Sequence, residues 1–382
     1  MPTDSPIHLS GSRIKVLSVF GTRPEAIKMA PVVRLLRASQ DRFQSRVCVT
    51  AQHRDMLDQV LRLFAITPDY DLDTMRKGQS PTQVAAAVLE KLESILQDEK
   101  PDWMIVQGDT TTVMAASLAA FHAGIKIAHI EAGLRTFDKL HPFPEETNRR
   151  VVSLVADLHC APTERARRNL LAEGVPAEQV HLTGNTVVDA LQWMAAQPFD
   201  VKTTALANIA RDRRVILVTA HRRENFGAPI VSICTALKRI AESHQDDVEI
   251  VYPVHPNPRI RTPVHEILGG LENVRLVAPL DYQPLVHLLM RCHLVLTDSG
   301  GIQEEAPIFG KPVLVLREVT ERPEGVEAGS AKIVGTDCDT IVECTERLLR
   351  DRAEYSKMAQ AVNPYGDGHA AERVVQALIR MT

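Results

Sequence analysis

Aromatic side chains are scarce in this chain of 382 residues. Phe, Trp and Tyr together make up 4% of the residues, whereas hydrophobic residues make up 45%, so the core must be mostly aliphatic. The formal net charge is -4, which excludes a generally basic surface that would hold nucleic acid. No apolar run is long enough to span a bilayer, and residues 1–13 lack the apolar core of a signal peptide. We therefore expect neither nucleic acid nor a membrane as a partner, and a loose tail over residues 1–13.

The cysteines form no Cys-x-x-Cys pair. Six of them are scattered along the chain, and Cys48 and Cys292 stand inside apolar segments. This distribution is typical of reduced, buried thiols, and we expect a cytoplasmic protein.

Short β-branched apolar runs alternate with longer helical patterns, which predicts βαβ units and parallel sheets. A polar region over residues 195–214 separates two sets of such units, and the length also favours about two domains. The expected strands are 15–20, 46–50, 103–107, 126–130 and one near His181 in the first set, then 215–219, 249–254, one near Val274, 294–297, 312–316 and 332–334 in the second.

The second set contains a strand that ends in Asp298-Ser299-Gly300-Gly301 and leads into a predicted helix. In an open α/β sheet, ligands bind at such corners. The first N–H groups of a helix have no internal partner, and two glycines let an anion approach the backbone, so this corner is a possible diphosphate site. Glu305, one turn further, is placed to accept hydrogen bonds from sugar hydroxyls. The alternative is a glycine-rich turn that binds nothing.

Charged residues follow three strands of the first set. Arg23, Asp109 and Glu131 each stand directly after a predicted strand, and such positions converge on one crevice of a parallel sheet. Glu145 lies in a proline-flanked acidic pair at the start of another helix. Taken singly, each could be a helix cap or a solvated helix start; their coincidence favours a site.

Two further patterns have competing interpretations. Arg23-Pro24-Glu25 recurs as Arg322-Pro323-Glu324, and two arginines could hold a diphosphate between them, although a three-residue match can arise by chance. The segment Asp69-Tyr70-Asp71 has the spacing of an Asp-x-Asp metal motif, but it precedes no glycine-rich phosphate turn. We interpret it as a solvated turn and expect no metal site.

Seven ordered motifs resemble those of UDP-N-acetylglucosamine 2-epimerases of the bacterial non-hydrolysing type. They are Gly21-Thr22-Arg23-Pro24-Glu25-Ala26-Ile27-Lys28, Gly108-Asp109-Thr110-Thr111, Glu131-Ala132-Gly133-Leu134-Arg135, Pro144-Glu145-Glu146, His221-Arg222-Arg223-Glu224-Asn225, Asp298 to Glu305, and Glu321-Arg322-Pro323-Glu324. The resemblance implies two Rossmann-like domains of the glycosyltransferase-B type, a UDP-sugar in a central cleft, no cofactor, and a homodimer. We expect the domains at 14–185 and 186–365, with a terminal helix over 366–382 that packs back on the first.

The resemblance also implies roles for single residues. Those that hold the diphosphate are Arg23, His221, Ser299, Gly300, Gly301 and Arg322; Glu305 holds the ribose, and the uracil contact falls on Leu280 and Leu285. Asp109, Glu131 and Glu145 surround the sugar, with Lys28 in the same pocket. A second, allosteric UDP-N-acetylglucosamine would contact Gln52, Glu145, Arg222 and His255, while Asp55 and Gly78 depart from the pattern of some members.

The implied activity is reversible epimerisation of UDP-N-acetylglucosamine to UDP-N-acetylmannosamine, in support of surface polysaccharide synthesis. The C2 proton of the sugar is not acidic at rest, but departure of UDP makes C1 oxocarbenium-like and C2 acidic. Elimination to a glycal and re-addition of UDP would then invert C2, with cations on the leaving group and carboxylates near both faces. The alternatives are a hydrolysing epimerase that releases N-acetylmannosamine and UDP, a glycosyltransferase on the same fold, and a non-catalytic nucleotide-sugar sensor.

Overall fold

The computed structural model describes residues 13–50, 54–74, 76, 78–210 and 212–382. The expected tail over 1–13 therefore lies outside the described residues except for Arg13. The chain divides into two compact units. Unit 1 comprises the described residues up to Ala190 together with Gly366–Thr382, and unit 2 comprises Leu191–Tyr365.

Unit 1 is built on a parallel sheet, whose seven described strands follow the order β3-β2-β1-β4-β5-β6-β7. The strands are β1 (Ile14–Phe20), β2 (Phe43–Val49), β3 (Tyr70–Asp71), β4 (Trp103–Gln107), β5 (Lys126–Ile130), β6 (Leu158–Ala161) and β7 (Val180–Leu182). All five residues of β4 are buried, as expected for a central strand covered by helices on both faces.

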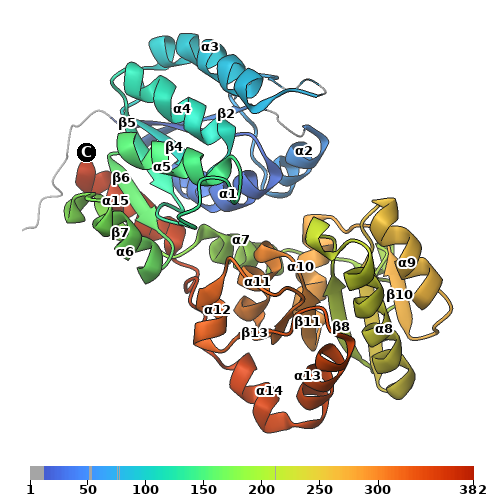
Figure 1. Ribbon diagram of the computed structural model, residues 1–382. Helices are drawn as coiled ribbons and strands as arrows, with labels where there is room; N and C mark the ends of the chain where they lie inside the picture. Colours follow the sequence, from blue (N-terminus) through green and yellow to red (C-terminus); the bar gives the residue numbers. More distant parts are fainter. Residues whose placement is uncertain (1–12, 51–53, 75, 77, 211) are drawn as a thin grey trace, which may run out of the picture. The chain divides into compact units, whose positions relative to one another are not determined.

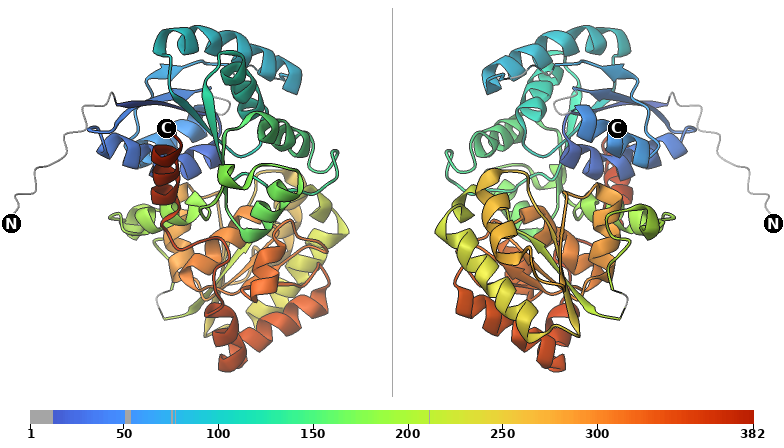
Figure 2. Two further views of the ribbon diagram at one scale, coloured as in Figure 1. Left: turned by 90° about the vertical axis from the view of Figure 1, so that its left-hand side faces the viewer. Right: turned by 90° about the vertical axis from the view of Figure 1, so that its right-hand side faces the viewer.

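Helices cover both faces of this sheet (Figure 1). They are α1 (Arg23–Ala38), α2 (Arg54–Leu63), α3 (Pro81–Glu99), α4 (Thr111–His122), α5 (Glu145–Val155), α6 (Glu164–Ala172) and α15 (Ala370–Met381). The helix α7 (Thr186–Ala195) begins in unit 1 and ends in unit 2. α3, α4 and α5 pack beside one another, and their apolar side chains join alternate strand residues such as Leu17, Val19 and Met104 in one aliphatic core. α1 packs along α15, which Figure 2 shows among the blue helices of unit 1.

The terminal helix α15 is joined to unit 1 by polar contacts at both ends. At its start, the Asp189 carboxylate accepts hydrogen bonds from the N–H groups of Ala370 and Ala371, at 3.2 and 2.8 Å. At its end, the Trp103 indole donates to the Thr382 hydroxyl at 2.9 Å. The last helix of the chain therefore completes the first unit.

Unit 2 repeats the same architecture with the order β10-β9-β8-β11-β12-β13 among its described strands. These are β8 (Arg214–Thr219), β9 (Val248–Pro253), β10 (Val274–Val277), β11 (Leu294–Thr297), β12 (Val313–Val315) and β13 (Ala331–Ile333). The helices are α8 (Ala228–Ser243), α9 (Pro258–Leu268), α10 (Tyr282–Arg291), α11 (Gly300–Glu305), α12 (Pro323–Ala328), α13 (Cys338–Arg350) and α14 (Arg352–Ala359). Successive residues of β8 point into opposite cores: Ile216 packs with α8, α9 and α13, and Leu217 packs with α10 and α11.

Both sheets reverse their strand order at an equivalent point. The reversal lies between β1 and β4 in unit 1 and between β8 and β11 in unit 2. Loops that follow such neighbouring strands diverge to opposite faces and leave a crevice at the carboxyl edge of the sheet, where ligands of open α/β sheets bind. Each unit thus has one position at which a ligand site is expected.

The predicted fold class, an α/β protein with two parallel sheets and alternating helices, is confirmed. The expected strands at 103–107 and 126–130 match β4 and β5 residue for residue. All six cysteines lie in the described part of the chain as free thiols, and each is buried except Cys338, which is half-buried. Among the described residues, no helix has both the length and the apolar character needed to cross a bilayer.

Candidate functional site

Glu25 joins the two loops at the reversal point of unit 1. Its buried Oε2 accepts hydrogen bonds from the N–H groups of Gly21 and Thr22, both at 2.7 Å, and Oε1 accepts from the Thr110 hydroxyl at 2.5 Å. Burial raises the pKa of Glu25, and these hydrogen bonds work in the opposite direction. The carboxylate therefore fixes the loops that follow β1 and β4 through hydrogen bonds to both of its oxygens.

Arg23 is the first residue of α1, beside this fixed loop. Its side chain is partly exposed, and among the described residues its guanidinium makes no hydrogen bond or ion pair. A cation without an internal partner at the carboxyl edge of a sheet is available to an anionic ligand.

Glu131, directly after β5, is surrounded by donors. Its Oε1 lies 2.5 Å from the Lys28 ammonium and accepts a hydrogen bond from the Asn185 amide at 3.1 Å, and Oε2 accepts from the Gln107 amide. The side chains of Lys28 and Glu131 are 14% and 7% exposed. The backbone of Glu131 has φ 64°, an uncommon conformation for a residue with a side chain. The fold thus imposes both the conformation and the partners of this carboxylate.

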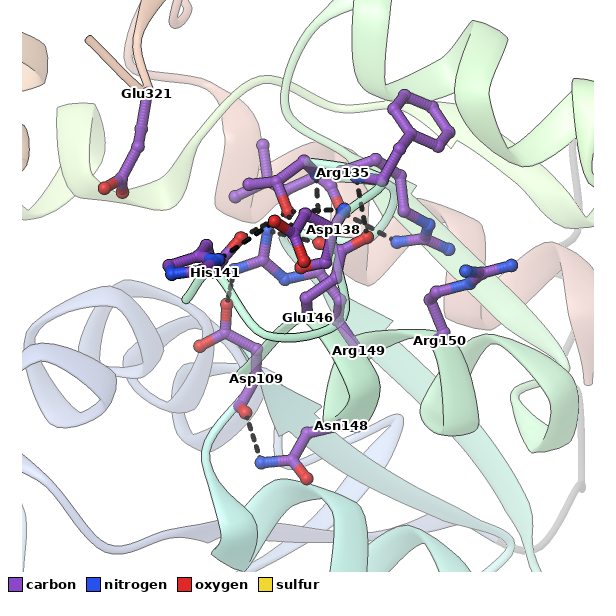
Figure 3. Close-up of polar contacts among 12 residues, drawn as sticks. Asp109, Arg135, Asp138, His141, Glu146, Asn148, Arg149, Arg150 and Glu321 are labelled. Atoms are coloured by element: carbon purple, nitrogen blue, oxygen red, sulfur yellow. Dashed lines mark hydrogen bonds and ion pairs between the residues drawn. The ribbon is translucent and has the colours of Figure 1, made fainter. Parts of the chain in front are cut away.

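Asp109 forms an ion pair with a helix that follows it in sequence (Figure 3). Its Oδ2 lies 2.5 Å from Nη2 of Arg149, and its carbonyl oxygen accepts a hydrogen bond from the Asn148 amide at 3.0 Å. Arg149 also lies 3.4 Å from the buried carboxylate of Glu146. One arginine therefore links Asp109 to the first turns of α5.

The two successive glutamates at the start of α5 have different environments. Glu146 is fully buried and accepts hydrogen bonds from the N–H groups of Thr136 and Phe137, at 3.0 and 3.1 Å, so it fixes the loop that precedes the helix. Glu145 is partly exposed, and its Oε2 atom is covered but has no hydrogen-bond partner among the described residues. Of the three predicted sugar-site carboxylates, Glu145 is thus the one that has no donor.

A buried histidine supports the loop that carries Asp109. His129 of β5 lies with Nε2 2.7 Å from the carbonyl oxygen of Gly108. Burial lowers the pKa of His129 to about 3, so the ring is neutral and Nε2–H is the donor to this carbonyl. Gly108 itself has φ 81°, which favours glycine.

In unit 2, Asp298 joins the two loops at the reversal point. It follows β11 and is fully buried. Its Oδ2 accepts hydrogen bonds from the N–H groups of His221 and Arg222, both at 2.7 Å, and from the Asn225 amide at 2.9 Å. Nδ1 of His221 lies 3.6 Å from Oδ1. Burial lowers the pKa of His221, the Asp298 carboxylate acts to raise it, and Arg222 and His255 act to lower it.

Two guanidinium groups face the backbone at Gly300. A Cβ atom placed there would lie 3.8 Å from Nη2 of Arg222 and 3.9 Å from Cζ of Arg322. Arg322 forms an ion pair with the buried carboxylate of Glu304. The guanidinium of Arg222 makes no hydrogen bond or ion pair with other described residues, and its covered Nε is without an acceptor. The corner therefore brings two guanidinium groups beside the backbone at Gly300.

The structure also describes the remaining predicted residues of unit 2. Ser299 donates its N–H to the Thr297 hydroxyl at 2.9 Å, and a Cβ atom on Gly301 would lie 3.7 Å from Oε1 of Glu305. Leu280 and Leu285 are half-buried against the core beneath α10 and α11. The exposed ring of His255 is stacked with the ring of His221 at a centroid distance of 5.6 Å.

The predicted turn at Asp69-Tyr70-Asp71 needs correction, and the predicted residue Gln52 lies outside the described residues. The segment Asp69-Tyr70-Asp71 is not a solvated turn, because Tyr70 and Asp71 form β3 and Asp69 accepts hydrogen bonds from Arg46 and from the N–H of Val47, both at 2.8 Å. The described part of the chain holds no group of three or more His, Cys, Asp or Glu side chains suited to a metal ion. Gln52 falls outside the described residues.

Sequence reasoning missed four polar residues of these edges. Gln107 and Asn185 hold Glu131, Arg149 pairs with Asp109, and Asp298 was seen only as part of a strand end. Gln107 was the one local signal of these contacts. It is a polar residue at the end of the otherwise apolar strand β4, and a buried amide there needs a hydrogen-bond partner.

Two Rossmann-like sheets, each with fixed loops at its reversal point and charged side chains beside them, define an α/β enzyme of the nucleotide-sugar class. The comparisons with known proteins make this specific. The family model described as UDP-N-acetylglucosamine 2-epimerase matches residues 36–379. The UDP-N-acetylglucosamine 2-epimerase of Escherichia coli K12 is 54% identical over 371 residues, which cover 96% of this chain and 98% of the relative.

Solved structures agree with these sequence matches. A putative UDP-N-acetylglucosamine 2-epimerase from Listeria monocytogenes aligns with a TM-score of 0.90 and 47% identity over 96% of both chains. The UDP-GlcNAc 2-epimerase from Neisseria meningitidis, solved bound to UDP-GlcNAc, aligns with a TM-score of 0.87 and 47% identity over 96% of this chain and 100% of the other. The chain belongs to the UDP-N-acetylglucosamine 2-epimerase family and is an enzyme of that family.

Proposed function

We propose that this enzyme interconverts UDP-N-acetylglucosamine and UDP-N-acetylmannosamine by eliminating UDP and adding it back. The observation that carries the proposal is the contrast between Glu131, Asp109 and Glu145. All three lie at the carboxyl edge of one sheet. Three donors hold Glu131, one arginine holds Asp109, and Oε2 of Glu145 has no partner among the described residues. Carboxylates in different environments are what proton abstraction and proton return at one carbon require.

The diphosphate is assigned to the Gly300 corner of unit 2. Gly300 and Gly301 carry no side chain, and the guanidinium groups of Arg222 and Arg322 lie beside the backbone at Gly300. Positive charge here stabilises the UDP anion as the C1–O bond breaks, when most negative charge develops on the leaving oxygen. His221 and Arg23 complete this set in the proposal.

The reaction balances without an external reagent. As the C1–O bond breaks, its electron pair leaves with UDP, and a carboxylate removes the C2 proton, so that a C1=C2 double bond forms. UDP then adds back to C1, and an acid delivers a proton to the opposite face of C2. Asp109, Glu131 and Glu145 are the groups that we assign to this proton transfer, with Lys28 balancing the charge of Glu131.

The nucleoside is assigned to the same side of the unit 2 sheet. Glu305, near Gly301, would accept hydrogen bonds from the ribose hydroxyls, and Leu280 and Leu285 would pack against uracil. Aliphatic side chains offer apolar contact but no ring for stacking, so we expect the base to contribute less affinity than the diphosphate.

The biological setting forms a further part of the proposal. An N-acetylmannosamine activated by UDP is a donor for glycosyl transfer, which fits a supply of surface polysaccharide precursors. Six free thiols support a reducing compartment such as the cytoplasm. We also propose a homodimer, which the molar mass in solution measured by light scattering would test.

We further propose that a second UDP-N-acetylglucosamine regulates the enzyme through Arg222, His255, Glu145 and Gln52. The support within the described residues is that Arg222 has no internal ion pair and that His255 is exposed. The rate should then depend sigmoidally on UDP-N-acetylglucosamine, and the reverse reaction should need some of it. Hyperbolic kinetics in both directions would remove this part of the proposal.

The reaction in D₂O tests the central proposal. Because the abstracting and returning groups stand on opposite faces of C2, deuterium should appear at C2 of UDP-N-acetylmannosamine from the first turnovers and later in the substrate pool. NMR of the mixture reads the label and the products together. Inverted product without deuterium at C2 would eliminate proton abstraction, and stoichiometric free N-acetylmannosamine with UDP would instead identify a hydrolysing epimerase.

A further inference from the structure

The carboxylate of Asp298 divides its two oxygens between two tasks. Oδ2 accepts three hydrogen bonds from the loop that follows β8: two from the N–H groups of His221 and Arg222 and one from the Asn225 amide. The Asn225 amide also donates to the carbonyl oxygen of Leu316 at 3.2 Å. Asp298 thus determines the backbone path that carries His221 and Arg222 to the edge of the sheet.

The second oxygen has no hydrogen bond, although it is buried. Oδ1 of Asp298 has no partner among the described residues, and Nδ1 of His221 lies 3.6 Å away. A buried carboxylate oxygen without a donor is costly, so a small rotation of the imidazole that brings Nδ1–H to Oδ1 is favourable. That hydrogen bond would fix the tautomer, because Nδ1 carries the proton and Nε2 is left on the far side of the ring.

The ring of His221 is partly exposed and is stacked with the ring of His255. The side chain of His221 is 40% exposed, whereas that of Asp298 is fully buried. The ring of His255 lies nearly parallel to it, with 11° between the planes. The Tyr252 hydroxyl, which packs near Asp298, donates to the carbonyl of Ala220 at 2.7 Å, and burial raises its pKa well above the usual value, so it adds no charge.

We propose that Asp298 is a positioning residue that holds His221 with Nδ1–H toward the carboxylate and allows its Nε2 to take up a proton when a nucleoside diphosphate binds. In the complex, the imidazolium of His221 lies between the Asp298 carboxylate and the phosphate. Its Nδ1–H donates a hydrogen bond to Asp298, and its Nε2–H donates one to a phosphate oxygen. The proton comes from solvent. This proposal rests on the proposed function only in that the ligand is a nucleoside diphosphate.

The electrostatics give the direction of the effect. Without ligand, burial, Arg222 and His255 lower the pKa of His221, and Asp298 alone among the nearby groups raises it. The imidazole of the free enzyme is then neutral at pH 7. A phosphate at Nε2 adds a second negative charge next to the ring and offsets Arg222, so ligand binding and protonation of His221 favour each other.

The test compares wild type with Asp298→Asn, using UDP as the probe. Asn keeps the shape and one carbonyl oxygen for the backbone N–H groups but removes the charge. We expect NMR of labelled imidazoles to show the Nδ1–H tautomer of His221 in the free wild type and a pKa that rises by more than one unit when UDP binds. In Asp298→Asn, this rise should shrink, and UDP affinity should depend less on pH between 6 and 8 than it does in the wild type.

The matched control is Glu25→Gln. Glu25 also accepts hydrogen bonds from two successive backbone N–H groups through one oxygen, but it lies in unit 1 and has no imidazole beside it. This variant should leave the titration of His221 in the free enzyme unchanged. A purely structural role for Asp298 would instead lower the melting temperature and leave the His221 titration unaltered, which would overturn the proposal.

If Asp298→Asn does not fold, the NMR spectrum of the wild-type enzyme still tests the proposal. An Nε2–H tautomer in the free enzyme, or no proton uptake on UDP binding by calorimetry in buffers of different ionisation enthalpy, would also overturn the proposal. Failure of the proposed function would look different: UDP would bind with the expected protonation, but no epimerised product would form.

Discussion

The Lys28 ammonium lies 2.5 Å from Oε1 of Glu131, and both side chains are largely shielded from water. Asn185 and Gln107 donate to the same carboxylate from other segments of unit 1. A carboxylate held in this way cannot rotate freely, so its position at this edge of the sheet is fixed before any ligand binds. Lys28 is therefore as important to this edge as the carboxylate itself.

The first prediction concerns this pair. Lys28→Met should lower the stability of the enzyme by about 3 kcal/mol, because it leaves a largely buried carboxylate without its counter-ion. The double variant Lys28→Met with Glu131→Gln should recover most of that loss, since the neutral amide needs no cation. Urea unfolding of the four proteins gives the coupling energy. Additive losses would show that the two side chains do not stabilise each other.

The second prediction separates UDP binding from chemistry. Arg322→Ala should weaken UDP binding roughly 10- to 100-fold, the value of a lost charge-assisted hydrogen bond. Asp109→Asn and Glu131→Gln should retain UDP binding and lose turnover, because they keep the shape of the side chain but remove its basicity. Calorimetric titration with UDP, together with initial rates, measures both quantities. Wild-type turnover in Asp109→Asn would remove Asp109 from the proton-transfer groups.

Arg322→Ala needs its own control, because Arg322 also balances the buried carboxylate of Glu304. The double variant Arg322→Ala with Glu304→Gln removes both charges of that pair. It should regain the stability lost in Arg322→Ala but not the affinity for UDP. If UDP affinity returned together with stability, the role of Arg322 would be to hold Glu304 and not to bind the diphosphate.

The third prediction is that activity persists in excess chelator. Arg222 and Arg322 already bring two positive charges to the proposed diphosphate position, so the leaving group has counter-charges without an added cation. The Asp-x-Asp segment is occupied elsewhere, since Asp69 bonds to Arg46 and to the Val47 backbone. Initial rates before and after treatment with EDTA test this. Loss of activity that Mg²⁺ restores would contradict it.

Much of the fold could be predicted from the sequence, because the spacing of apolar residues and the residues that favour turns are properties of short segments. The pattern located β4 and β5 to the residue but missed β3 and β6. β3 has only two residues, and β6, Leu158–Ala161, contains His159 where an apolar residue would mark a buried strand. Neither carries enough periodic signal to stand out.

The site was less accessible, because its defining contacts join distant parts of the chain. Strand ends identified Asp109 and Glu131 as candidates, but not their partners. Arg149 lies 40 residues from Asp109 in the sequence. Asp298 lies 77 residues from His221, whose N–H donates a hydrogen bond to it. Such pairs depend on strand order, and strand order follows from packing of whole units, which local patterns do not encode.

The fourth prediction uses two buried histidines of unit 1. His129 and His159 face each other on β5 and β6, and burial lowers the pKa of His129 to about 3 and that of His159 to about 4. Both pKa values lie below that of an unfolded histidine, about 6.5. The stability that depends on these neutral rings is thus fully present above pH 6.5, and it is lost as pH falls toward 4, because only the unfolded chain takes up the protons.

Each buried histidine should add up to about 1.4 kcal/mol of lost stability per pH unit in this window. Urea unfolding between pH 7.5 and 4.5 measures the slope, and Trp103 in β4 reports on unit 1 when Trp193 is replaced by Phe. The pair of changes His129→Gln and His159→Gln should flatten the slope even if it lowers stability at pH 7.5. Replacing the exposed His122 by Gln should leave the slope unchanged. An equal slope in all three proteins would mean that other groups cause the acid sensitivity.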